Sequence, residues 1–458
     1  MNQIMRKRTP STFAIVTFGC QMNARDSEKL VGILEKMGFK ETEEEQADIV
    51  IYNTCTIREN ANQKLYGHLG TLKKRKEKNP DMIIGLCGCM MQKEDTVQYV
   101  REKFPFVDLM FGTFNFHRAP VFIERLLNGE KQVMEIWDSP KEHVEHLPER
   151  RKYAFKGGVN IMYGCNNFCT YCVVPSVRGR ERSRIPEDIL MDVRALAEDG
   201  VKEIMLLGQN VNSYGVNFME KEKSEILKST TGYAFPNLLR DVCRIEGIER
   251  VRFMTSHPKD LSEDLIRVVA EEEKVCKHIH LPVQSGSTDV LRRMNRHYTR
   301  EDYLLLVEKI RKAVPDVSLT TDIMVGFPGE TDQDFADTVS LVEQVGYDQA
   351  FTFIYSVRSN TPAAEMEQLP TDLVSHRFQT LLEVVRRRST EVTARFTGQV
   401  LPVLCEEENR HTPGYMTGKT EHNITVHFPG TPDLLGQIIP VRLDTCKGFY
   451  YFGSIMNE

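Results

Sequence analysis

The sequence lacks any uninterrupted apolar stretch of the ~18 residues that a membrane helix needs. The apolar stretch nearest its start, Phe13 to Phe18, is shorter than the ~7 to 15 residues of a secretory leader. Basic residues are not in excess, since 59 Lys and Arg stand against 65 Asp and Glu, a net charge of -6. This balance excludes indiscriminate coating of nucleic acid but permits a local basic groove. We therefore expect a cytoplasmic protein without membrane contact, in which any contact with RNA would have to be regional.

Cysteine is too sparse for a disulfide scaffold, with 11 among 458 residues. The number is odd, and in a reducing cytosol clustered thiols more often bind metal or catalyse than form disulfides. The spacing of the cysteines therefore decides how they are interpreted.

Residues 12–130 alternate short β-branched or aromatic runs with amphipathic helical stretches, which predicts an α/β domain with a doubly wound parallel sheet. The predicted strands are Phe13 to Phe18, Asp48 to Tyr52, Met82 to Leu86 and Val107 to Phe111. Helices are expected from Asp26 to Met37, from near Arg58, beyond Gln92 and beyond His117. Residues 131–152 show no period and are interpreted as a linker.

Residues 151–389 repeat the alternation with six parallel strands, which predicts a partial (β/α)6 barrel with its chemistry at the carboxyl ends of the strands. The expected strands are Val159 to Met162, Glu203 to Leu207, Arg250 to Met254, His278 to Leu281, Leu319 to Val325 and Gln349 to Ile354. After a charged helix, residues 391–454 show short strands with Gly and Pro turns, typical of a small all-β barrel.

Three cysteines lie on one short loop after the first barrel strand: Cys165, Cys169 and Cys172. Three thiolates can hold three irons of a [4Fe-4S] cluster and leave the fourth iron open to a chelating ligand. A zinc knuckle is the alternative, but structural zinc takes four protein ligands and no fourth Cys or His follows at a matching spacing. The spacing therefore favours a cluster.

A second set of cysteines follows the first three strands of residues 12–130: Cys20, Cys55 and Cys89. Successive carboxyl ends of a parallel sheet lie side by side, where such sheets bind ligands, so these thiols should converge. The alternative is three buried structural cysteines. Each one lies at a Gly or Asn break, where the backbone leaves the sheet, which favours a second three-cysteine site.

Four segments carry a family resemblance. The cluster loop Gly164 to Cys172 (GCNNFCTYC) is similar to that of the radical S-adenosylmethionine superfamily. The segments around the other cysteines resemble the methylthiotransferase amino-terminal domain: Thr17 to Asn23 (TFGCQMN), Asn53 to Arg58 (NTCTIR) and Gly88 to Gln92 (GCMMQ). The terminal β-domain resembles the TRAM module. Met91, where the family usually has Ala, and the extra Cys87 depart from the pattern, and we interpret Cys87 as strand packing.

The resemblance implies two [4Fe-4S] clusters and S-adenosylmethionine, which yields a 5′-deoxyadenosyl radical able to attack an inert C–H bond. It implies methylthiolation of carbon 2 of N(6)-dimethylallyladenosine at position 37 of tRNA, with sulfur presented by the Cys20, Cys55 and Cys89 cluster. A second S-adenosylmethionine would donate the methyl group. Threonylcarbamoyladenosine and a ribosomal-protein aspartate are alternative substrates, although Gln21 to Asn23 favours the dimethylallyl branch. A non-catalytic iron-sulfur carrier is the alternative of another class.

Implied partners are the tRNA anticodon stem-loop, an electron donor such as flavodoxin or ferredoxin, and a sulfur source. The candidates for cofactor contact are Tyr171, which lies beside two loop cysteines and would shield the cluster or stack near adenine, and polar residues at strand ends: Gln209, Asn210, Gln284, Ser285 and Asp322. Gln284 and Ser285 could instead cap the next helix. Four arginines alternate beyond the cluster loop and would face RNA phosphates from one side: Arg178, Arg180, Arg182 and Arg184.

Two further groups have competing interpretations. Cys276, His278 and His280 share one strand face, which suits either a zinc triad or an ordinary barrel strand. The stretch 391–458 has five Lys or Arg against eight Asp or Glu, a net charge of -3. Strong electrostatic capture of RNA by this module alone is therefore not expected. It would instead read RNA shape through exposed groups such as Tyr415, His422 and Asn423. Cys243, Cys405 and Cys446 match no motif and are expected to be structural.

Overall fold

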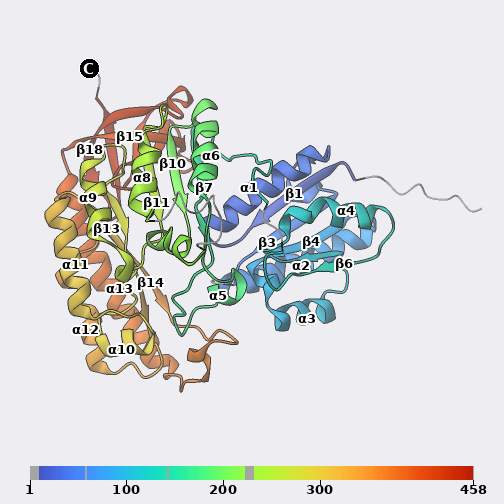
Figure 1. Ribbon diagram of the computed structural model, residues 1–458, viewed down its shortest axis with the longest axis horizontal. Coiled ribbons are helices and arrows are strands. Elements are labelled where there is room, and N and C mark those ends of the chain that lie inside the picture. Colours follow the sequence, from blue (N-terminus) through green and yellow to red (C-terminus); the bar gives the residue numbers. More distant parts are fainter. Residues whose placement is uncertain (1–9, 57–58, 142–143, 222–231, 457–458) are drawn as a thin grey trace, which may run out of the picture. The chain divides into compact units, whose positions relative to one another are not determined.

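The computed structural model describes residues 10–56, 59–141, 144–221 and 232–456. Their contacts divide the chain into two units (Figure 1). Unit 1 comprises Met1–Lys152, Tyr163–Cys165 and Val173–Arg180, and unit 2 comprises Tyr153–Met162, Asn166–Cys172 and Glu181–Glu458. In the described part of the chain, no helix has the length and apolar character that crossing a membrane requires.

Unit 1 contains a parallel sheet of six strands in the order β2-β1-β3-β4-β5-β6. The strands are β1 Thr12–Thr17, β2 Lys40–Glu41, β3 Ile49–Thr54, β4 Ile83–Gly88, β5 Leu109–Phe111 and β6 Val133–Glu135. The helices are α1 Gln21–Lys36, α2 Glu59–Lys78, α3 Glu94–Lys103, α4 Ala119–Leu127 and the short α5 Val174–Val177.

Alternate residues of these strands face opposite sides of the sheet, as the period of two requires. Ile49 and Ile51 pack with α1 and α4, whereas Val50 and Tyr52 pack with apolar residues of α2 and α3. Helices therefore cover both faces, and the predicted doubly wound arrangement is confirmed. Arg58, near which the second helix was expected to begin, lies outside the described residues.

The interpretation of residues 131–152 as a linker is wrong at its start. Val133–Glu135 forms β6, which pairs in parallel with β5, and Val133 is fully buried. A strand of three residues is too short to show a period of two. The prediction also missed β2, whose two residues are polar and exposed.

Unit 2 begins with six parallel strands in two sheets, β11-β10-β7 and β12-β13-β14, linked by a parallel bridge between Val251 and Val275. The strands are β7 Lys156–Asn160, β10 Glu203–Leu207, β11 Arg250–Met254, β12 His278–His280, β13 Ser318–Val325 and β14 Gln349–Ile354. Two short strands, β8 Met162–Tyr163 and β9 Arg182–Ser183, flank the cluster loop in the chain. The predicted six-stranded partial barrel is confirmed, with its first strand earlier than expected.

Amphipathic helices follow these strands and bury their apolar sides in one large core. They are α6 Pro186–Glu198, α8 Phe235–Cys243, α9 Glu263–Glu271, α10 Thr288–Arg293, α11 Arg300–Ala313, α12 Asp332–Val345 and α13 Thr371–Thr393. The exception is α10, whose Val290 packs in a smaller core. Capping boxes begin α11 at Thr299 and α12 at Thr331, where each hydroxyl accepts a hydrogen bond from the third helical N–H.

The chain ends in a closed barrel with the strand order β15-β16-β17-β19-β18. Its strands are β15 Val400–Glu408, β16 Tyr415–Thr420, β17 Thr425–Pro429, β18 Ile438–Cys446 and β19 Tyr450–Ile455. The predicted all-β barrel is confirmed, but its first strand begins at Val400 rather than near residue 391. Arg387 and Arg388 pair with Glu391 at helical spacing, which carries α13 on to Thr393.

Two arginines of β11 fasten this closed barrel to the parallel strands within unit 2. Arg250 donates to the carbonyl oxygens of Lys419 and Pro402 at 2.9 and 2.7 Å. Arg252 donates to those of Thr420 and Glu421 at 2.7 and 3.1 Å. The Arg252 guanidinium also forms an ion pair with Glu203 on β10 at 2.9 Å, with both side chains buried.

Removing the Glu203 carboxylate should destabilise the fold strongly, because the Arg252 charge would remain buried without its counter-ion. For Glu203→Ala we expect the free energy of unfolding to fall by ~3 to 5 kcal/mol, measured by urea denaturation of the full chain. The control is Glu249→Ala, whose carboxylate pairs with Lys202 in an exposed position. That change should cost about 1 kcal/mol or less. Equal losses in both variants would contradict a buried, interdependent pair.

Candidate metal and cofactor sites

Cys20, Cys55 and Cys89 follow the carboxyl ends of three neighbouring strands of unit 1. Cys20 is the N-cap of α1 after β1, Cys55 follows the last residue of β3, and Cys89 follows the last residue of β4. Because the sheet order runs β1-β3-β4, the three positions lie along one edge. The structure thus brings the three predicted residues to the same edge.

A buried asparagine lies among these thiols. Asn23 Oδ1 is 4.0 Å from Cys20 Sγ and 3.7 Å from Cys89 Sγ. Its amide nitrogen donates to the carbonyl oxygens of Phe18, just after β1, and of Thr54, the last residue of β3. Cys55 lies beside Gly19, since a Cβ built on Gly19 would be 2.6 Å from Cys55 Sγ. Two of the three thiols, those of Cys20 and Cys89, therefore lie around the Asn23 side chain, and Cys55 lies beside the neighbouring Gly19.

Two glycines allow this arrangement. Gly19 precedes Cys20 with φ +113° and Gly88 precedes Cys89 with φ +90°, a region that residues with a side chain rarely adopt. A Cβ on Gly88 would also lie 2.4 Å from the Asn53 side-chain oxygen and from the Thr54 carbonyl oxygen. At both positions glycine lets the chain leave the strand sharply, directly before a candidate ligand.

Arg178 contacts the third thiol of the set. Its Nε donates to Cys89 Sγ at 3.1 Å, and its Nη2 donates to Asn23 Oδ1 at 2.7 Å and pairs with the Asp26 carboxylate at 2.7 Å. Burial raises the pKa of Cys89 to about 11, whereas the Arg178 charge acts in the opposite direction. The guanidinium is thus placed to stabilise a thiolate at Cys89.

The expectation that four arginines line up to face RNA phosphates is wrong for two of them. Arg178 and Arg184 are buried. Arg184 donates to the Asn160 carbonyl oxygen and pairs with Asp192, both at 2.8 Å. Arg178 is the C-cap of the short helix α5 and Arg184 follows the two-residue strand β9, so the four arginines do not form one continuous extended segment. Arg180 is exposed and Arg182 is half-buried.

Among the described residues, no three His, Cys, Asp or Glu side chains are grouped closely enough for a single metal ion. A [4Fe-4S] cluster makes a different demand, because each cysteine binds a different iron and the sulfurs stand farther apart than around one ion. Three soft thiol donors at one edge, with a cation beside one of them, fit such a cluster. The residues of unit 1 therefore suit the predicted group.

In the barrel loop, Cys169 is buried, whereas Cys165 and Cys172 are half-buried. A second buried arginine contacts Cys169: Arg296 Nη1 donates to its Sγ at 3.4 Å. The other nitrogens of Arg296 donate to the Pro282 carbonyl oxygen at 2.9 Å and to Tyr298 Oη at 3.0 Å. Sequence reasoning missed Arg296, since it lies 127 residues from Cys169 and belongs to no spacing pattern.

The first three predicted cofactor residues lie in the cluster loop and beyond the end of β10, all within unit 2. Tyr171 is half-buried and packs edge-on against Phe327, with ring centroids 6.4 Å apart. Gln209 and Asn210 lie two and three residues beyond the end of β10, and the Asn210 amide nitrogen donates to Asp260 at 2.7 Å. The Asn210 side-chain oxygen is buried and has no hydrogen-bond partner within the described chain.

The other three predicted cofactor residues, Asp322, Gln284 and Ser285, differ in their exposure and in their contacts. Asp322 on β13 is partly exposed and lies 3.6 Å from His280 Nε2. Gln284 has a φ of +71° and bridges to β13 through its backbone. Ser285 is fully buried, and its hydroxyl hydrogen-bonds Thr338 on α12 at 3.2 Å. The Ser285 hydroxyl is thus engaged within the fold, which argues against contact with a cofactor.

Buried polar groups that sequence reasoning did not single out also lie at strand ends. Asn160 ends β7, is 2% exposed, and neither its side-chain oxygen nor its nitrogen has a hydrogen-bond partner in the described residues. Ser256 Oγ and His257 Nε2, just after β11, share this property. Burial lowers the pKa of His257 to about 2, so its ring is neutral. Such buried polar atoms fit a bound polar ligand.

The other cysteines behave as structural thiols. Cys87 lies in the apolar core between the unit 1 sheet and its helices, which confirms its interpretation as strand packing. Cys243 and Cys405 belong to apolar cores of unit 2. The zinc alternative at Cys276 is not favoured, because Thr320 Oγ1 hydrogen-bonds both His278 and His280 at 2.9 Å.

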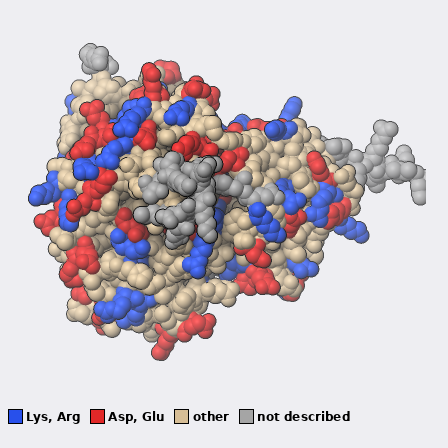
Figure 2. Space-filling model, in the orientation of Figure 1, with Lys and Arg blue, Asp and Glu red and all other residues tan. Residues whose placement is uncertain are grey.

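The closed barrel presents fewer RNA-reading candidates than expected. His422 is buried, packs on the Phe396 ring at 4.7 Å between centroids and hydrogen-bonds Asp316, so its expected exposure is wrong. Tyr415 and Asn423 are half-buried. Acidic and basic side chains are intermixed on the face seen in Figure 2, consistent with regional rather than general attraction for RNA.

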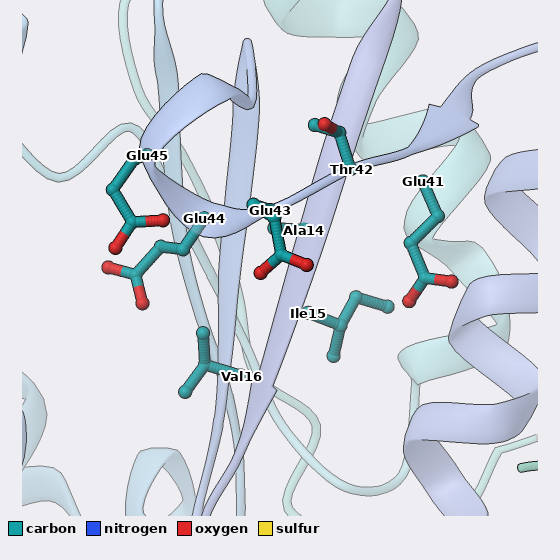
Figure 3. A pocket seen from close by; sticks show the side chains of 8 residues that line it. All are labelled: Ala14, Ile15, Val16, Glu41, Thr42, Glu43, Glu44 and Glu45. Atoms are coloured by element: carbon teal, nitrogen blue, oxygen red, sulfur yellow. The ribbon is translucent and has the colours of Figure 1, made fainter.

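A surface hollow of unit 1 is lined by strongly acidic residues. Glu41, Glu43, Glu44 and Glu45 lie over Ala14 to Val16 of β1 (Figure 3). Glu44 accepts a hydrogen bond from Tyr52 Oη at 2.5 Å. Four carboxylates repel a polyanion, so this hollow does not suit tRNA.

Family models match three segments of the chain. The radical SAM superfamily matches residues 159–342, the uncharacterized protein family UPF0004 matches residues 12–112, and the TRAM domain matches residues 394–456. Among solved structures, the radical S-adenosylmethionine methyltransferase TsrM of Kitasatospora setae aligns with a TM-score of 0.53 and 14% identity, covering 77% of this chain and 75% of that chain. This likeness supports the fold.

Curated relatives match nearly the whole chain. The tRNA-2-methylthio-N(6)-dimethylallyladenosine synthase of Lachnoclostridium phytofermentans is 53% identical over 450 residues, which are 98% of this chain and 96% of the relative. The protein of the same name in Clostridium tetani is 50% identical over 450 residues, covering 98% and 97%. The resemblance found in the sequence is confirmed, and the chain belongs to the tRNA-2-methylthio-N(6)-dimethylallyladenosine synthase family of radical S-adenosylmethionine proteins.

Proposed function

We propose that this protein methylthiolates carbon 2 of N(6)-dimethylallyladenosine at position 37 of tRNA. The observation that carries the proposal is the gathering of Cys20, Cys55 and Cys89 along one sheet edge, in a chain that also has the three-cysteine barrel loop. The barrel loop suffices to hold one cluster, so the second set of cysteines is available for a separate task. Relatives about 50% identical over nearly the full length bear the name of this activity.

Two [4Fe-4S] clusters and S-adenosylmethionine belong to this family. We assign one cluster to Cys165, Cys169 and Cys172 and the other to Cys20, Cys55 and Cys89. Bound at these sites, the clusters and S-adenosylmethionine would supply radical C–H activation, the inserted sulfur and the methyl group. Acid-base chemistry could not activate carbon 2, because its aromatic C–H has no acidic proton.

The residues of the chain then have separable tasks. Arg296 fixes Cys169 from within the core, and Asn23 holds Cys20 and Cys89 together. The candidates to bind S-adenosylmethionine are Tyr171 of the cluster loop and polar groups at strand ends: Gln209, Asn210, Gln284, Asp322 and Asn160. Arg180 and Arg182 are the candidates for phosphate contact on the anticodon stem-loop.

We further propose a cytoplasmic setting, because the substrate of the named relatives is tRNA. An electron donor such as flavodoxin or ferredoxin would reduce the clusters, and a separate sulfur source would replace the inserted atom. The names of the relatives support dimethylallyladenosine over threonylcarbamoyladenosine or a ribosomal-protein aspartate as the substrate.

Mass spectrometry of tRNA nucleosides tests the proposal. In a strain without this gene, the 2-methylthio derivative of dimethylallyladenosine should disappear and unmethylthiolated dimethylallyladenosine should accumulate. Restoring the full chain should reverse both changes. Unchanged 2-methylthio-dimethylallyladenosine would contradict the assignment, and loss of the threonylcarbamoyl derivative instead would transfer it to the other tRNA substrate.

A further inference from the structure

Arg178 is held rigidly beside the unit 1 cysteines from several directions. Its guanidinium contacts Cys89 Sγ, Asn23 Oδ1 and Asp26, and its side chain is 6% exposed. The three contacts use two nitrogens of the planar guanidinium, Nε and Nη2, which are held at a fixed spacing. The side chain is therefore part of the cysteine site rather than of a solvent-facing surface.

The backbone carrying Arg178 is also anchored within unit 1. Thr113 Oγ1 donates to the Val177 carbonyl oxygen at 2.8 Å, and Val173 and Val177 pack against Cys89. The Cys165 backbone N–H donates to the Gly179 carbonyl oxygen at 3.2 Å, which links the segments Tyr163–Cys165 and Val173–Arg180 of unit 1. The position of the guanidinium is thus set by apolar packing as well as by its own polar contacts.

We propose that Arg178 is a positioning residue that orients the Cys89 sulfur and raises the reduction potential of the cluster held by Cys20, Cys55 and Cys89. The inference rests on the proposed function only in that these three cysteines hold a cluster. It replaces the RNA-binding role expected for this arginine, and it assigns Asp26 an opposing effect on the same potential.

The physical reason is the charge that reduction adds. A reduced cluster is more negative, so a nearby cation and an N–H donor to its cysteine sulfur stabilise the reduced state. Burial strengthens the effect, because water does not screen charges there as it does at the surface. Asp26 lies against the same guanidinium and should act with the opposite sign.

The experiment measures this potential directly, in the full chain with Cys165, Cys169 and Cys172 replaced by Ala. Only the unit 1 cluster then remains, and a redox titration followed by electron paramagnetic resonance reports its midpoint. For Arg178→Gln we expect reduction to become at least tenfold less favourable, about 59 mV to the negative side for one electron. Arg178→Lys should shift the midpoint less, because it keeps the charge and loses the fork. Asp26→Asn should shift it to the positive side.

Arg180→Gln is the matched control, two residues away and exposed, and it should leave the midpoint unchanged. Arg296→Gln should also leave it unchanged, since Arg296 contacts the other set of cysteines. If Arg178→Gln loses its iron, the other two variants test the inference: the midpoint should move to the negative side in Arg178→Lys and to the positive side in Asp26→Asn. Iron present with no shift in any Arg178 or Asp26 variant overturns the inference alone. A parent protein that binds no iron overturns the cluster assignment together with it.

Discussion

Replacing Cys169 with alanine should abolish both cleavage of S-adenosylmethionine and methylthiolation of tRNA. We propose Cys169 as one of only three thiolates that hold the barrel cluster, and it is buried with Arg296 against its sulfur. Removing a ligand should cost more than the ~10- to 100-fold that loss of an outer partner costs. We therefore expect an activity loss above about 100-fold, with iron falling from about eight to about four atoms per chain.

The measurement combines iron analysis with chromatography of 5′-deoxyadenosine under reducing, anaerobic conditions. Cys446→Ala is the control, because this thiol is half-buried in the closed barrel and donates to the Gly448 carbonyl oxygen. The control should keep both iron and cleavage activity. Full 5′-deoxyadenosine formation by Cys169→Ala would remove the barrel loop from the mechanism.

The second large effect is the difference expected between Cys89 and Cys87, two cysteines of the same stretch of chain. Cys89→Ala should eliminate methylthiolation while S-adenosylmethionine is still cleaved, because only the sulfur-presenting cluster is lost. Cys87→Ala should retain methylthiolation, since Cys87 packs in the apolar core of the sheet. The latter variant should lose ~1 to 2 kcal/mol of stability, as expected when a small buried group is deleted.

Liquid chromatography with mass spectrometry of the tRNA product and of 5′-deoxyadenosine separates these results. The pair is matched, because both thiols are buried and belong to the same stretch of chain. If Cys87→Ala lost methylthiolation and Cys89→Ala kept it, the ligand assignment would move to Cys87. Loss of cleavage in Cys89→Ala would instead show that the two cysteine sets do not act separately.

Most of the fold could be predicted from the sequence because buried parallel strands read as apolar runs between helices. The bounds of β10, β11 and β14 are those expected. The errors occur where the local pattern is weakest. β6 is only three residues long, and α13 continues through ion pairs to Thr393, where the sequence pattern predicted that the terminal barrel had already begun. The predicted domain limits 12–130, 151–389 and 391–454 stay predictions.

The cysteine sites were predictable for a different reason. Spacing of one strand–helix unit places Cys20, Cys55 and Cys89 at one sheet edge, whatever the details of packing. Arg178 and Arg296 were not predictable in their roles, because each meets its cysteine through contacts 89 and 127 residues apart in sequence. The alternation of arginines beyond the cluster loop suggested a surface, and only tertiary packing decides which of them are inside.

Arg250 and Arg252 make the carboxyl-terminal barrel difficult to remove or exchange. They donate hydrogen bonds to four carbonyl oxygens of its backbone, so these contacts do not depend on the identity of the side chains there. A chain shortened to end before Val400 would leave two guanidinium groups without these acceptors at the base of the parallel strands. A transplanted barrel would have to place main-chain acceptors at all four points, so we expect side-chain substitutions there to be tolerated better than insertions.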